Sequence, residues 1–103
     1  MYTISIKVEK RNIMDIFNSP IKEKADYLEI CAHCMGIRII SSNSIEKYFI
    51  DDFFLPSENT TRSYGFIVTY ERVKEEFVPK QVTKVSPYEI QLRIDAMGLH
   101  FGE

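Results

Sequence analysis

The string Cys31, Ala32, His33 and Cys34 is the place in this 103-residue sequence where chemically versatile side chains lie closest together. Two cysteines three positions apart suit a redox pair or half of a zinc site. We expect them in the last turn of a helix, where the negative end of the dipole disfavours a thiolate. A closed zinc site needs four ligands, and the distant His100 is the one further candidate. We therefore predict packing and surface roles, with no metal and no cofactor.

Carboxylates form a second candidate group, because Glu46, Asp51 and Asp52 lie near one another in the sequence. Glu46 and Asp52 together with His100 would suit a small metal-dependent hydrolase or nuclease, which is our alternative function. Metal-binding carboxylates must converge, whereas neighbouring aspartates on a helix diverge by about 100°. We therefore expect solvated surface charge at these positions.

Other catalytic classes lack their sequence signatures. The chain has four glycines, at positions 36, 65, 98 and 102, which do not make up a phosphate loop or a dinucleotide fingerprint. No Gly-Xaa-Ser-Xaa-Gly string marks a serine nucleophile. We name no catalytic residue and lean away from an enzyme.

Aromatic residues are the most conspicuous remaining feature. Tyr48, Phe49, Phe53 and Phe54 fall in one short segment with acidic residues among them. An aromatic centre with a polar rim is typical of a protein interface, although a thin domain would bury the same rings in its core. The predicted binding residues are Tyr48, Phe49, Asp51, Asp52, Phe53, Phe54, Arg62 and Tyr64.

These features favour a non-catalytic protein-binding module, a small regulator or inhibitor that occupies a surface of a larger protein. A phage or mobile-element inhibitor of a host defence enzyme would suit a compact acidic domain of this length. A homodimer through an uncovered sheet edge is a further expectation, since an open strand edge is a template for pairing.

Charge and hydropathy limit the other partners. Thirteen Lys and Arg against fifteen Asp and Glu give a net charge of −2, which disfavours nucleic acid. No apolar run approaches the ~20 residues of a membrane-spanning helix. Charged residues from Lys7 onward interrupt the N-terminus before a signal-peptide core. We expect a cytoplasmic protein without a membrane partner.

The length predicts a single compact α+β domain over residues 1–103. Fourteen isoleucines against four leucines favour strands, because β-branched side chains suit a pleated surface. We expect a four- to five-stranded sheet, mostly antiparallel or mixed. Two main helices, at about 20–35 and 44–55, would pack on one face of it.

Hydrophobic periodicity places the other elements. Strict alternation predicts a strand at 2–9, and short apolar runs predict a buried strand at 37–40 and a central strand at 65–72. We expect a helical turn at 12–17 and a loop at 56–63, whereas 73–85 is ambiguous and any strand through Pro79 belongs at an edge or bulge. Ser86, Pro87 and Glu89 form a capping box, but the alternation that follows leads us to predict a strand at 86–97.

Overall fold

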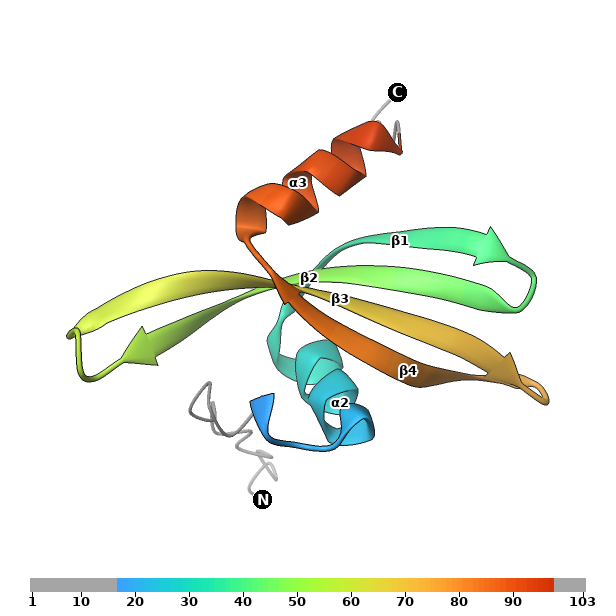
Figure 1. Ribbon diagram of the computed structural model, residues 1–103, viewed down its shortest axis with the longest axis horizontal. Helices are drawn as coiled ribbons and strands as arrows, with labels where there is room; N and C mark the ends of the chain where they lie inside the picture. The colour runs from blue at the N-terminus through green and yellow to red at the C-terminus, as the bar shows by residue number, and fades with distance from the viewer. Residues whose placement is uncertain (1–16, 98–103) are drawn as a thin grey trace, which may run out of the picture.

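The structure is a computed structural model, and it describes residues 17–97. Four antiparallel strands form one sheet in chain order, with one helix on each of its faces (Figure 1). The α+β class and the four-stranded antiparallel sheet are thereby confirmed. The elements are α2 (Ile21–Cys31), β1 (His33–Ser41), β2 (Ser44–Leu55), β3 (Thr60–Val73), β4 (Glu76–Val85) and α3 (Pro87–Ala96).

Helix α2 covers one face of the sheet and forms the larger core with it. Alternate residues of β2 and β3 point to this face, where their rings meet one side of the helix. The buried members are Ala25, Tyr27, Leu28, Phe49, Phe53, Phe66, Val68 and Tyr70.

Polar contacts tie α2 to the same face of the sheet. Glu29 of the helix accepts a hydrogen bond from the Tyr70 hydroxyl at 2.9 Å and pairs with Lys47 Nζ at 2.6 Å. The Lys47 ammonium also lies 5.2 Å from the centre of the Tyr70 ring. Burial, followed by the carboxylate of Glu29, raises the pKa of Tyr70 above its ordinary value.

Helix α3 covers the opposite face and forms a smaller core of Tyr48, Ile67, Ile90 and Ile94. Gly65 of β3 makes the close approach between helix and sheet possible. A Cβ atom at this position would lie 2.6 Å from Ile90 Cγ1 and 2.9 Å from the carbonyl oxygen of Ser86. The helix therefore docks where the strand has no side chain.

The predicted helix at 44–55 is wrong, because these residues form β2, a central strand buried on both faces. Tyr48 points toward α3, whereas Phe49 and Phe53 point toward α2. Because both faces of β2 are apolar, its apolar residues follow one another without the alternation of a half-exposed strand. Such a run also contains pairs spaced three and four positions apart, as a helix does. Asn43, directly before this segment, lies in the turn between β1 and β2.

The predicted strand at 86–97 is also wrong, because α3 occupies Pro87–Ala96. The Ser86 side chain accepts a hydrogen bond from the Glu89 backbone N–H at 3.1 Å, as the capping box indicated. The helix buries Ile90 and Ile94, four positions apart, and leaves Tyr88 and Leu92 exposed. Alternation here therefore does not mark a buried strand face.

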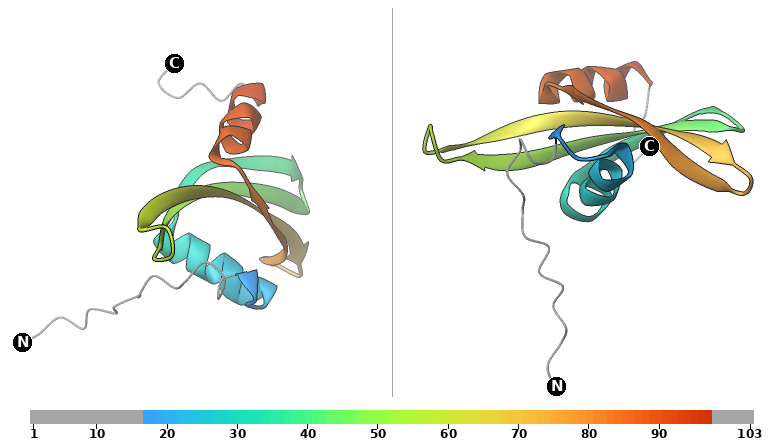
Figure 2. Two further views of the ribbon diagram at one scale, coloured as in Figure 1. Left: turned by 60° about the vertical axis from the view of Figure 1, so that its left-hand side comes forward. Right: turned by 60° about the horizontal axis from the view of Figure 1, so that its bottom comes forward.

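The helix predicted at 20–35 ends early, at Cys31. Ala32 is extended and β1 begins at His33, so the chain leaves the helix to pair with β2. The predicted strand at 37–40 lies inside β1, but its isoleucines at 37, 39 and 40 are exposed because β1 is an edge strand. The expectation that both helices share one face is wrong as well, since α2 and α3 lie on opposite faces (Figure 2).

The remaining expectations fall into three groups. The strand at 65–72 is confirmed within β3, and Pro79 lies in edge strand β4 at a register irregularity opposite Tyr70, as predicted. The loop at 56–63 is wrong beyond Asn59, because residues 60–63 pair with β2. The strand at 2–9 and the turn at 12–17, apart from Phe17, lie outside the described residues.

Candidate protein-contact surfaces

Residues 51–64 form a two-stranded hairpin, which we call the arm. β1 pairs with β2 from Ser44 to Ile50, and β4 pairs with β3 from Gly65 to Val73. β2 and β3 continue to pair with each other from Asp51–Tyr64 out to Leu55–Thr60. The arm therefore extends past the other two strands, and Figure 2 shows that it also extends beyond both helices.

The inner face of the arm is fixed to the α2 core by Phe53. This side chain is 2% exposed, and its ring stacks on Tyr27 at a centroid distance of 6.3 Å. Its edge-to-face contacts are with Tyr64 at 5.9 Å and Phe66 at 6.2 Å. Beside it, buried Asp51 accepts a hydrogen bond from the Tyr27 hydroxyl at 3.3 Å. The arm is thus held in one position at its base.

The outer face of the arm presents Phe54. This side chain is 57% exposed, although it directly follows buried Phe53. Thr61 lies directly opposite it on β3, and the next pair on the same face of the arm is Asp52 and Ser63. The Ser63 hydroxyl donates a hydrogen bond to the Asp52 carboxylate. One exposed ring therefore lies among short polar side chains with hydrogen-bonding capacity.

The turn at the tip of the arm is well ordered by its own contacts. The Glu58 backbone N–H donates to the carbonyl oxygen of Leu55 at 3.1 Å, and Asn59 adopts the left-handed conformation with φ of 50°. Arg62 pairs with the Glu58 carboxylate at 2.6 Å. The hairpin is thus closed both by its backbone and by its side chains.

The eight predicted binding residues separate into core and surface groups. Tyr48, Phe49 and Phe53 are core residues. Asp51 is buried beside them, so the expectation of solvated charge is wrong at this position. Asp52 and Phe54 are exposed on the outer face of the arm, whereas Arg62 is exposed on the inner face, opposite Phe53. Tyr64 is half-buried at the base of the arm, where the Lys84 ammonium lies 5.1 Å from its ring centre.

The β1 edge is a second exposed apolar surface; the sequence led us to expect a homodimer through a sheet edge but did not identify the strand. Ile39 is 77% exposed and Ile37 is 48% exposed, and Met35 and Ile40 of the same strand are exposed too. Within residues 17–97 no strand pairs with the outer side of β1. A run of aliphatic residues predicts a strand equally well at an edge or at the centre of a sheet, so sequence pattern alone did not show this exposure.

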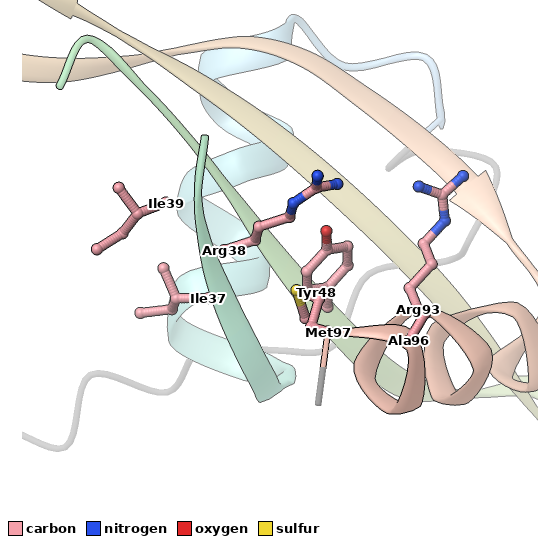
Figure 3. A pocket seen from close by; sticks show the side chains of 7 residues that line it. All are labelled: Ile37, Arg38, Ile39, Tyr48, Arg93, Ala96 and Met97. Carbon is pink, nitrogen blue, oxygen red and sulfur yellow. The ribbon is translucent and has the colours of Figure 1, made fainter. Parts of the chain in front are cut away.

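A groove of about 600 Å³ lies between β1 and the C-terminal end of α3, with Tyr48 at its base (Figure 3). The Tyr48 hydroxyl donates to Glu46 at 2.6 Å, and burial and this carboxylate raise the pKa of Tyr48. Two arginines line the groove, and each faces a carboxylate: Arg38 lies 4.0 Å from Glu46, and Arg93 lies 2.9 Å from Glu89. The charge of the groove is therefore largely compensated.

The two described residues of the alternative hydrolase, Glu46 and Asp52, lie far apart. Glu46 and Asp52 are six positions apart on β2, which corresponds to roughly 20 Å along an extended strand. His100 lies outside the described residues. Cys31 packs half-buried against the α2 core and Cys34 is exposed at the start of β1. Among residues 17–97, no three His, Cys, Asp or Glu side chains are grouped so that they could hold a metal ion.

Comparisons with known proteins add no further constraint. No family model, no curated protein and no solved structure matches this chain. Neither helix in the described part of the chain has the length and apolar character that crossing a membrane requires.

Proposed function

We propose that the protein is a binding module that acts by occupying a surface of a larger protein, and that the arm makes this contact. The observation that carries the proposal is the contrast between two adjacent phenylalanines. Phe53 fixes the inner face of the arm in the core, whereas Phe54 projects from the outer face at 57% exposure.

The arm has the construction of an interface anchor. A large aromatic side chain at the centre of a contact commonly contributes 2 kcal/mol or more when it fills a partner pocket. Asp52, Thr61 and Ser63 around it supply the polar rim that surrounds such an anchor. Because the hairpin is already held by Phe53 and by the Glu58–Arg62 pair, little conformational freedom is lost on binding.

The chemistry of the arm defines the partner surface. Phe54 requires an apolar pocket of the size of one ring, and the Asp52 carboxylate at its side favours hydrogen-bond donors or a basic group on the pocket rim. A small regulator or inhibitor is the role that we infer, as for a phage or mobile-element protein directed against a host defence enzyme. The compact size and the net charge of −2 support this setting.

Affinity purification from the native host with three forms of the protein tests the proposal. We expect the wild-type chain and Tyr88→Ala to retain the same partner, because exposed Tyr88 lies on α3, away from the arm. Phe54→Ala should lower the affinity for that partner roughly 30-fold, the equivalent of about 2 kcal/mol. Unchanged retention by Phe54→Ala would remove the arm as the contact surface.

A further inference from the structure

We propose that the protein forms a two-fold symmetric homodimer in which β1 pairs antiparallel with β1 of a second copy, with Ile37 opposite Ile37 at the centre. This inference goes beyond the proposed function, because it concerns a different surface and does not depend on the arm.

The two edges of the sheet differ in their protection against pairing. On β4, Pro79 has no N–H to donate, the register is irregular beside it, and Lys80 and Lys84 add exposed charge. β1 has no proline, and Arg38 is its one Lys or Arg. Its exposed side chains at positions 35, 37, 39 and 40 are apolar. An edge of this composition that is unpaired within residues 17–97 is a template for another strand.

Charge at the β1 edge is directed away from the open side. The face of β1 that carries Arg38 is the face of its cross-strand partner Glu46 and of Tyr48, whereas Ile37 and Ile39 lie on the other face (Figure 3). The Arg38 guanidinium lies 4.0 Å from the Glu46 carboxylate. An incoming strand therefore meets isoleucines on one face and an arginine already engaged within its own chain on the other.

The sequence of β1 is complementary to itself in one register. The strand has nine residues and Ile37 is the central one, so a two-fold axis at Ile37 pairs the whole strand. Met35 then lies opposite Ile39 of the second copy, and Arg38 lies opposite Gly36, which has no side chain to obstruct it. A two-fold axis at Arg38 would instead place two guanidinium groups directly opposite each other, which is unfavourable.

The two register shifts in the pairing of β1 with β2 lie outside the segment around Ile37, the position of the proposed axis. The register of β1 against β2 shifts between Cys34 and Gly36 and again between Ile39 and Ser41. Between them, residues 36–39 pair without interruption, and Ile37 lies within this regular segment. Pairing would join two four-stranded sheets into one of eight strands and place the isoleucines of both copies side by side on one face, where they partly cover one another. The two arms would then project from opposite ends.

Molar mass measured by sedimentation over a range of protein concentrations tests the inference on the full chain. We expect a shift with concentration from 12.1 kDa to twice that mass. Ile37→Lys and Ile37→Glu should each be monomeric throughout, because two like charges meet at the axis. An equimolar mixture of the two variants should form the dimer again, since Lys then lies opposite Glu. Thr83→Lys on exposed β4 is the matched control and should dimerise as the wild type does.

Two results would overturn the inference directly: a wild-type protein that is monomeric at every concentration, and a dimer that persists in Ile37→Lys. Failure of the mixture to associate would overturn the register. Two variants that each introduce one cysteine give a second measurement. Both are made in a chain that also carries Cys31→Ala and Cys34→Ser, so that the native thiols are absent. Ile37→Cys should form an intermolecular disulfide under mild oxidation, whereas Ile39→Cys should not, because residue 39 lies opposite Met35. The reverse pattern would contradict the proposed centre.

Discussion

The two faces of the sheet bury very different sets of side chains. The α2 face holds a large aromatic core that continues onto the arm through Phe53. The α3 face holds four buried residues, three of them isoleucines, and depends on Gly65 for close packing. Helix α3 ends its contact with the sheet before the arm begins (Figure 2). Within residues 17–97, one face of the arm is therefore covered by core side chains, and the other carries exposed Phe54.

This difference separates the residues that stabilise the fold from those available for binding. The ring of Phe53 contacts three other aromatic rings, whereas the ring of Phe54 is exposed on the α3 side of the sheet, in the part of β2 that extends past this helix. Because side chains alternate along a strand, one position decides which role a phenylalanine takes. The predictions below test this division, beginning with the largest expected effect.

Phe53→Ala should lower the free energy of unfolding by about 3–5 kcal/mol, the usual range for the removal of a fully buried aromatic side chain. Phe54→Ala should change it by no more than ~0.5 kcal/mol, because that side chain is exposed. Urea unfolding monitored by circular dichroism compares the two variants. Similar losses of stability in both would mean that the arm is covered on both faces.

Gly65→Ala should cost about 1–3 kcal/mol, because the new methyl group would overlap Ile90 and the Ser86 carbonyl oxygen. The damage should concentrate on the smaller core, so hydrogen exchange should accelerate in α3 more than in α2. In a chain that carries Ile90→Ala, and so lacks Cγ1, Gly65→Ala should cost less than it does in the wild type. Equal acceleration in both helices would contradict the independence of the two faces.

Ser86→Ala should cost about 1 kcal/mol, since the Glu89 N–H loses its acceptor at the start of α3. Ser86→Asp should preserve the stability, because aspartate is also a good N-cap. Thermal unfolding of the three proteins measures the difference. If the alanine variant is as stable as the wild type, the cap does not contribute to the docking of α3.

Tyr70→Phe should lower the free energy of unfolding by roughly 1 kcal/mol, as Ser86→Ala does, and should change the pH dependence of stability. The pKa of Tyr70 is raised in the folded state, so its contribution is fully present below the ordinary tyrosine pKa of 10.0 and is lost as the pH rises through the folded-state pKa. The wild type should therefore lose stability above pH 10.0 more steeply than Tyr70→Phe. Parallel pH profiles would show that this hydroxyl does not titrate differently on folding.

The α+β class, the helix beginning near residue 20 and the central strand at 65–72 followed from the sequence, because each has a pattern that local physics determines. The strand β2 did not. A segment that is apolar on both faces loses the alternation that distinguishes a strand from a helix, and Tyr48 and Phe49 illustrate this by their burial on opposite faces. For α3, the cap at Ser86 was the correct signal and the alternation was misleading.

The candidate contact surfaces were predicted only in part. The aromatic segment was identified, yet its division into buried Phe53 and exposed Phe54 depends on which side α2 covers. That arrangement is set by tertiary packing between segments distant in the sequence. The exposure of Ile37 and Ile39 likewise follows from the position of β1 at the edge of the sheet, which local pattern does not encode.

Photo-crosslinking from position 54 tests the central claim, contact through the exposed face of the arm, most directly. The photoreactive amino acid p-benzoylphenylalanine would replace Phe54 in one protein and Tyr88 of α3 in another, and both would be illuminated with the native host extract. We predict that position 54 crosslinks to a defined partner and that position 88 does not crosslink to the same partner. The same partner from both positions, or crosslinks from position 88 alone, would contradict the claim.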